Sequence, residues 1–132
     1  MVKKAVPRKV KSLLQQYQLL LNERRMSEAE KVLQQIKERL KSTPWDRGFF
    51  NALEGIFAAF RAKDNPYFYA TQIDPSDTKK LRQLRKEFHE ESANPLQNEF
   101  DQGFFSAWAE YVKDLQRLTR QSLKESIPKT TQ

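Results

Sequence analysis

The chain contains no cysteine and a single histidine, His89. The lack of cysteine excludes disulfide bonds and zinc–thiolate sites and is typical of a protein from a reducing compartment. All three glycines fall in segments that we predict to be helical, which excludes a phosphate-cradling loop and a dinucleotide-binding fingerprint. No nucleophile elbow and no pair of histidines at helical spacing is present. We therefore expect a protein that is not an enzyme and needs no cofactor or metal.

Long apolar runs are also absent. No segment approaches the length of a transmembrane helix. The first seven residues are basic, like the start of a signal peptide, but no uninterrupted apolar stretch follows them. We therefore expect a cytoplasmic protein without a membrane partner.

Glycine and β-branched residues are scarce, whereas Leu, Lys, Glu, Gln, Arg and Ala are abundant, which favours helix. Apolar residues at helical spacing and the proline and capping signals predict an all-α bundle of about five helices in one domain, 1–132. The predicted helices cover residues 7–22, 27–43, 44–63, 75–93 and about 99–124. We group them into a basic arm (1–7), a first helical unit (8–63), a second helical unit (74–124) and a frayed tail (125–132).

Two heptapeptides resemble each other across the chain. Residues 46–52 and 101–107 share five of seven positions at an offset of 55, including a glycine followed by two phenylalanines. Thr43 and Asn98 are suitable N-cap residues three positions before Asp46 and Asp101, so the flanking capping signals agree as well. The pattern predicts an internal two-fold duplication.

Small residues in the third predicted helix lie at intervals of four, three and four positions, namely Gly48, Ala52, Gly55 and Ala59. Glycine inside a helix costs about 1 kcal/mol relative to alanine, and close packing of another backbone is the expected compensation. The repeat places Gly103 and Ala107 on the corresponding face of the last helix. We therefore expect the third and fifth helices to cross glycine against glycine.

Asp46 and Asp101 are candidates for a shared-proton or metal site because a two-fold axis would pair them. The competing interpretation is that each carboxylate complements the N-terminus of its helix, and we favour it. His89 could act as a base, but it lies on a charged outer helix, where a solvated side chain is the expected state.

Positive charge is concentrated near the beginning of the chain. Residues 1–44 carry a net charge of +7, whereas residues 45–132 are neutral, and residues 1–22 contain five cations and no acid. Such clusters neutralise phosphates. We predict a nucleic-acid-binding surface formed by Lys3, Lys4, Arg8, Lys9, Lys11, Arg24 and Arg25.

The favoured function is a non-enzymatic binding module that associates with RNA or a nucleoprotein. The alternative is a protein–protein adaptor or a homodimer, which would use the glycine face or the aromatic run Tyr67, Phe68 and Tyr69. The aromatic run could equally plug the end of the bundle.

Overall fold

The structure is a computed structural model that describes residues 6–62 and 73–126, with side chains as far as residue 121. These residues form five α-helices and no strand, which confirms the all-α prediction. The helices are α1 (Arg8–Asn22), α2 (Met26–Arg39), α3 (Pro44–Ala62), α4 (Thr78–Ala93) and α5 (Glu99–Ser126).

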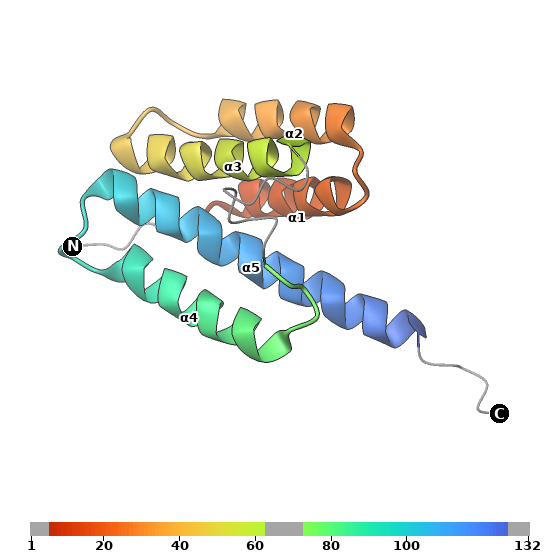
Figure 1. Ribbon diagram of the computed structural model, residues 1–132. Coiled ribbons are helices and arrows are strands. Elements are labelled where there is room, and N and C mark those ends of the chain that lie inside the picture. Colours follow the sequence, from red (N-terminus) through yellow and green to blue (C-terminus); the bar gives the residue numbers. More distant parts are fainter. Residues whose placement is uncertain (1–5, 63–72, 127–132) are drawn as a thin grey trace.

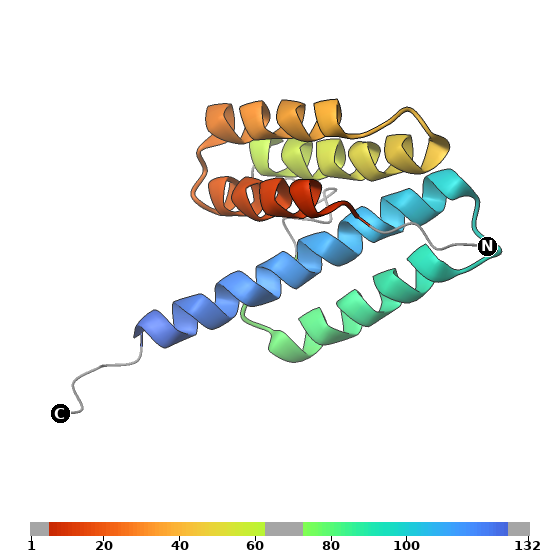
Figure 2. The same ribbon diagram turned by 180° about the vertical axis from the view of Figure 1, so that it is seen from behind.

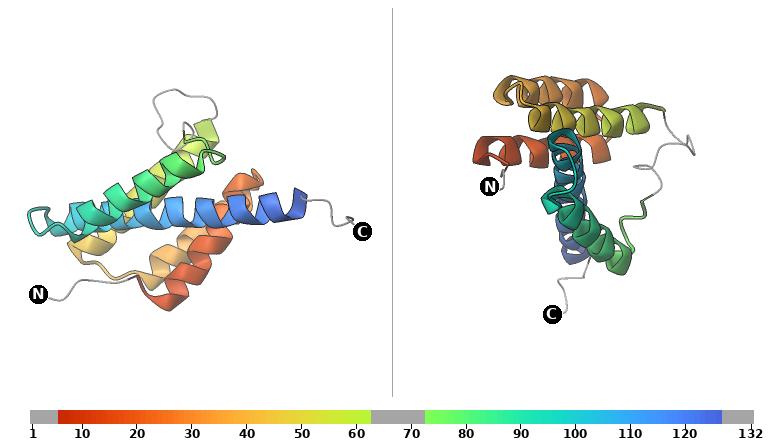
Figure 3. Two further views of the ribbon diagram at one scale, coloured as in Figure 1. Left: turned by 90° about the horizontal axis from the view of Figure 1, so that it is seen from below. Right: turned by 90° about the vertical axis from the view of Figure 1, so that its left-hand side faces the viewer.

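The helices are arranged as two groups (Figure 1). Helices α1 and α2 form an antiparallel hairpin, and α3 lies beside them. Helices α4 and α5 form a second antiparallel hairpin, and α5 crosses the first group obliquely (Figures 2 and 3). The long α5 helix contacts α3, α4 and α1, so it joins the two groups.

The crossing of α3 and α5 is closed by two glycines. A Cβ atom added at Gly48 would overlap the backbone carbonyl of Phe100, and one added at Gly103 would overlap the carbonyl of Trp45. The contact is reciprocal, because Phe100 stands three residues before Gly103 as Trp45 stands three residues before Gly48. The predicted glycine-to-glycine crossing is confirmed.

The other predicted member of this small-residue face does not belong to it. Gly55 is exposed, and a Cβ atom there would meet nothing within 4 Å. Ala52 and Ala59 are each 1% exposed and lie in the core. The prediction of a packed face of four small residues is therefore wrong at Gly55, which lies on the solvent-facing side of α3.

Both halves of the repeat also begin in the predicted way. The backbone N–H of Asp46 donates to Thr43 Oγ1 at 3.2 Å, and that of Asp101 donates to Asn98 Oδ1 at 2.8 Å. The correspondence does not extend to whole units, because the first predicted unit contains three helices (α1 to α3) and the second contains two (α4 and α5). The duplication itself stays a prediction.

Two predicted helix starts are wrong. Helix α2 begins at Met26 rather than at Ser27, because Arg24 adopts a left-handed φ of 59° and the chain turns there. The N–H of Arg25 then bonds the carbonyl of Leu20 at 2.9 Å, which closes a Schellman turn. Helix α4 is capped by Asp77, which accepts from Lys80 N at 3.0 Å, whereas Asp74 bonds Ser76 in the preceding turn.

The burial of apolar side chains distinguishes the inner helices from α4. Trp45 is buried and stacks on Phe49 with a centroid distance of 5.0 Å. Only Leu81 and Leu84 of α4 are buried, which confirms its position on the outside of the bundle. The repeat makes Phe100 the counterpart of Trp45 and predicts that it too lies in the core, but it is only half-buried.

Alanine substitutions at the three glycines test the crossing. We expect Gly48→Ala and Gly103→Ala each to lower the free energy of unfolding by about 2 kcal/mol or more, because the obstructing atoms belong to backbone that cannot rotate away. Gly55→Ala is the matched control and should raise stability by about 0.5–1 kcal/mol, since it adds helix propensity in open space. Urea denaturation measures all three, and a neutral Gly48→Ala would contradict a close crossing.

Candidate nucleic-acid interface

The fold gathers cations from three helices at one end of the first group. Because α1 and α2 are antiparallel, the amino end of α1 adjoins the carboxyl end of α2, and the start of α3 lies toward the same end (Figure 1). We call these cations the basic end, which comprises Arg8, Lys9, Lys11, Lys37, Arg39, Lys41 and Arg47. Lys11 is half-buried, and the other side chains of the set are exposed.

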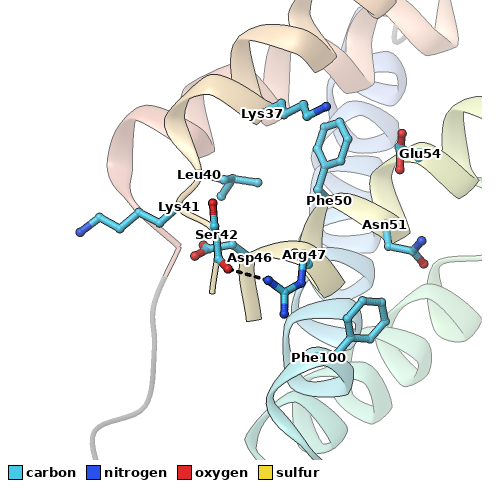
Figure 4. Close-up of a pocket in the computed structure, with 10 residues that line it drawn as sticks. All are labelled: Lys37, Leu40, Lys41, Ser42, Asp46, Arg47, Phe50, Asn51, Glu54 and Phe100. Carbon is cyan, nitrogen blue, oxygen red and sulfur yellow. Dashed lines mark hydrogen bonds between the residues drawn. The ribbon is translucent and has the colours of Figure 1, made fainter. Parts of the chain in front are cut away.

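A hollow of about 440 Å³ lies between α2, α3 and the start of α5 (Figure 4). Leu40, Phe50 and Phe100 give it apolar walls, and all three are half-buried. The ammonium of Lys37 lies 5.6 Å from the centroid of the Phe50 ring, a cation–π arrangement.

Polar groups at the hollow are held differently from one another. Arg47 donates to the carbonyl of Ser42 at 2.7 Å, which fixes its guanidinium beside the hollow, whereas Lys41 extends away from it (Figure 4). Glu54 is the exposed acid on the opposite side. The hollow therefore combines aromatic surface with Arg47, which is held by a hydrogen bond, and with two exposed lysines, Lys37 and Lys41.

Asp46 also lines the hollow, but its carboxylate is engaged in the N-terminus of α3. It is 4% exposed and accepts hydrogen bonds from the hydroxyl and the backbone N–H of Thr43. This capping box is the interpretation that we favoured for the carboxylate. In the described part of the chain, no three His, Asp or Glu side chains come together as a metal site would require.

The structure separates two of the predicted nucleic-acid-binding arginines from Arg8, Lys9 and Lys11. Arg24 and Arg25 lie at the far end of α1, and its 15 residues span about 22 Å. Arg24 donates to the carbonyl of Phe60 at 2.9 Å and lies 5.0 Å from the centroid of that ring. Arg25 bonds Glu28 and Glu23, and the hydrogen bond to Glu28 raises its pKa. Arg24 therefore joins the turn after α1 to α3, whereas the partners of Arg25 are local, two and three residues away.

Other predicted residues fall elsewhere. Lys3, Lys4 and the aromatic run Tyr67, Phe68 and Tyr69 lie outside the described residues. His89 is exposed on α4, as expected. The prediction did not include four members of the basic end, Lys37, Arg39, Lys41 and Arg47. The first three lie in residues 1–44, whose net charge of +7 was the available signal, but only the packing of the helices brings the end of α2 near the start of α1.

A buried carboxylate lies near the basic end. Asp114 of α5 is 4% exposed, and burial together with the charge of Glu110 raises its pKa to about 6. Arg117 Nε is 4.0 Å from Asp114 Oδ1, and the positive charges of Arg117, Lys113 and the α1 residue Lys11 oppose the rise only in part. Burial also raises the pKa of the neighbouring Tyr111 hydroxyl to about 12.

The raised pKa of Asp114 predicts a pH-dependent stability. Its folded-state pKa of about 6 exceeds the ordinary value of 3.8, so the folded state holds the proton more tightly. This residue's contribution to stability therefore grows as the pH falls from about 7 to about 4. We expect Asp114→Asn to raise the free energy of unfolding by about 1–2 kcal/mol at pH 7.5.

The difference between Asp114→Asn and the parent should shrink toward zero at pH 4, where both side chains are neutral. Urea denaturation between pH 4 and pH 8 measures it. A difference that does not change with pH, or a variant that is less stable at pH 7.5, would show that the carboxylate is not destabilised by its burial.

Comparisons with known proteins add no assignment to this geometry. No protein-family model matches the chain, and no match was found among the curated proteins or the solved structures. Within residues 6–62 and 73–126, none of the helices has the length and apolar character needed to cross a bilayer.

Proposed function

We propose that the protein is a non-enzymatic module that binds RNA through its basic end. The observation that carries this proposal is that the start of α1, the end of α2 and the start of α3 lie toward one end of the first group and together carry seven cations. The acids in the same stretches are Glu38 and Asp46, and Asp46 is occupied as a helix cap. A surface of this kind releases counterions from a phosphate backbone when it binds.

The hollow favours single-stranded RNA over a double helix. Single-stranded RNA presents unstacked bases, and these are commonly bound on aromatic rings next to cations. Phe50 and Phe100 offer half-buried rings at the hollow, with Lys37 and Arg47 beside them. A base could enter between the rings while the lysines contact the adjoining phosphates. Lys3 and Lys4 would add charge to the same interface.

The alternative, a protein–protein adaptor or homodimer, loses one of the two surfaces suggested for it. Gly48 and Gly103 are buried against each other's helix within the chain and cannot receive a partner. The aromatic run at 67–69 is the other surface and lies outside the described residues. No described contact supports the adaptor beyond the sequence.

Charge neutralisation tests the RNA proposal. Lys9→Gln with Lys41→Gln removes two exposed cations of the basic end. We expect weaker binding of a mixed-sequence single-stranded RNA. The slope of log K against log salt should become shallower by about 1.4, because two phosphate contacts are lost and each contributes about 0.7 on a single strand. Fluorescence anisotropy over a range of KCl concentrations measures both quantities.

The matched control is Lys31→Gln with Arg61→Gln, which removes the same charge from exposed positions outside the basic end. We expect this control to keep the salt dependence of the parent. If the parent does not bind RNA at low salt, or if both pairs weaken binding equally, the basic end is not an RNA interface.

A further inference from the structure

A second cationic region lies in the second half of the chain, although the net charge of that half is zero. Residues 78–86 contain five cations and no acid, while the acids that balance them stand later in α4, at Glu87, Glu90 and Glu91. The cations and the acids therefore lie on different turns of the helix, so that the first half of α4 is strongly basic and its last turns are acidic. The average charge of zero over residues 45–132 hides this separation.

The basic half of α4 borders a groove against α5. The groove has a volume of about 400 Å³, and the exposed side chains of Arg82 and Arg85 from α4 and Arg120 from α5 line it. Leu81, which is fully buried, also contributes to the lining. The remaining lining residues, Thr78, Gln116 and Thr119, are neutral, so no carboxylate belongs to the groove.

Contacts between the two helices hold the groove in shape. Arg85 donates to Gln116 Oε1 at 3.1 Å across the helix pair, which orients its guanidinium. The Thr119 hydroxyl approaches the carbonyl of Pro75 at 2.9 Å, so the turn before α4 is tied to α5. The acids of that turn have their own partners, since Asp77 caps α4 and Asp74 bonds Ser76.

We propose that this groove binds a phosphate group. Guanidinium groups form paired hydrogen bonds that match phosphate oxygens, and three of them converge here. The lining contains no aromatic ring on which a base could stack, so the chemistry recognised is the phosphate itself. The phosphate can belong to a nucleic-acid backbone or to a small phosphorylated molecule.

The phosphate proposal is independent of the proposed function. The groove is lined by residues of α4 and of the second half of α5, whereas the basic end belongs to α1, α2 and α3, so the two share no residue. Pyrophosphate, which has no base or sugar, therefore probes the groove without testing RNA recognition.

Titration of the ¹⁵N-labelled protein with pyrophosphate at low salt tests the groove. We expect saturable amide shifts confined to residues 78–85 and 116–120, with a Kd in the millimolar range or tighter. Arg82→Gln with Arg120→Gln should weaken binding about tenfold, because two charge-assisted contacts are lost. The matched control, Lys79→Gln with Lys86→Gln, removes equal charge from exposed α4 positions outside the groove and should change Kd less than about threefold.

Absence of saturable shifts in the groove, or equal weakening by both pairs, would overturn the proposal. Circular dichroism of each variant confirms that its helices are intact, so that lost binding is not lost folding. A single-stranded RNA that displaces pyrophosphate from these amides identifies a phosphodiester as the ligand. Retention of pyrophosphate in its presence identifies a small phosphorylated molecule, and either result supports the phosphate site.

Discussion

The structure depends on the close approach of two helix backbones, α3 and α5, at Gly48 and Gly103. Each glycine gives room to a carbonyl of the other helix, so the crossing point is fixed from both sides. With its first turns held against α3, α5 can take α4 along one side and still reach α1. The contact thus sets the position of both hairpins, although it is made by residues without side chains.

The distribution of charge follows from this arrangement. In the first group, antiparallel packing brings the start of α1, with its cations, beside the last turns of α2, which also carry cations. In the second group, antiparallel packing places the last turns of α4, with their acids, beside the start of α5, with Glu99 and Asp101. The arginines that line the groove lie toward the other end of this hairpin. Both cationic regions are therefore products of helix direction, which a count along the chain does not contain.

Local signals in the sequence predicted the helices well because each has a short-range cause. The capping residues Thr43 and Asn98, the prolines and the apolar spacing act within one or two turns. The predicted helix bounds leave a short turn at residues 23–26, but they do not indicate the left-handed conformation of Arg24, whose side chain bonds the distant carbonyl of Phe60. The assignment of Lys37, Arg39, Lys41 and Arg47 to the basic end likewise depends on long-range structure, because it requires knowing which helix ends lie together in the fold.

Arg24 and Asp114 both contradict local preferences, but the structure compensates them to different extents. Arg24 adopts a conformation that usually costs about 1 kcal/mol, and it gains a hydrogen bond and a ring contact that join α1 to α3. Asp114 gains only a long ion pair with Arg117 and the more diffuse attraction of Lys113 and Lys11, and its raised pKa shows that these do not offset burial. The contacts of Arg24 therefore offset its backbone strain, whereas the raised pKa of Asp114 predicts that its carboxylate lowers the stability of the fold at neutral pH. Because Lys11 belongs to the basic end, this cost arises where α5 supports the surface that we assign to RNA.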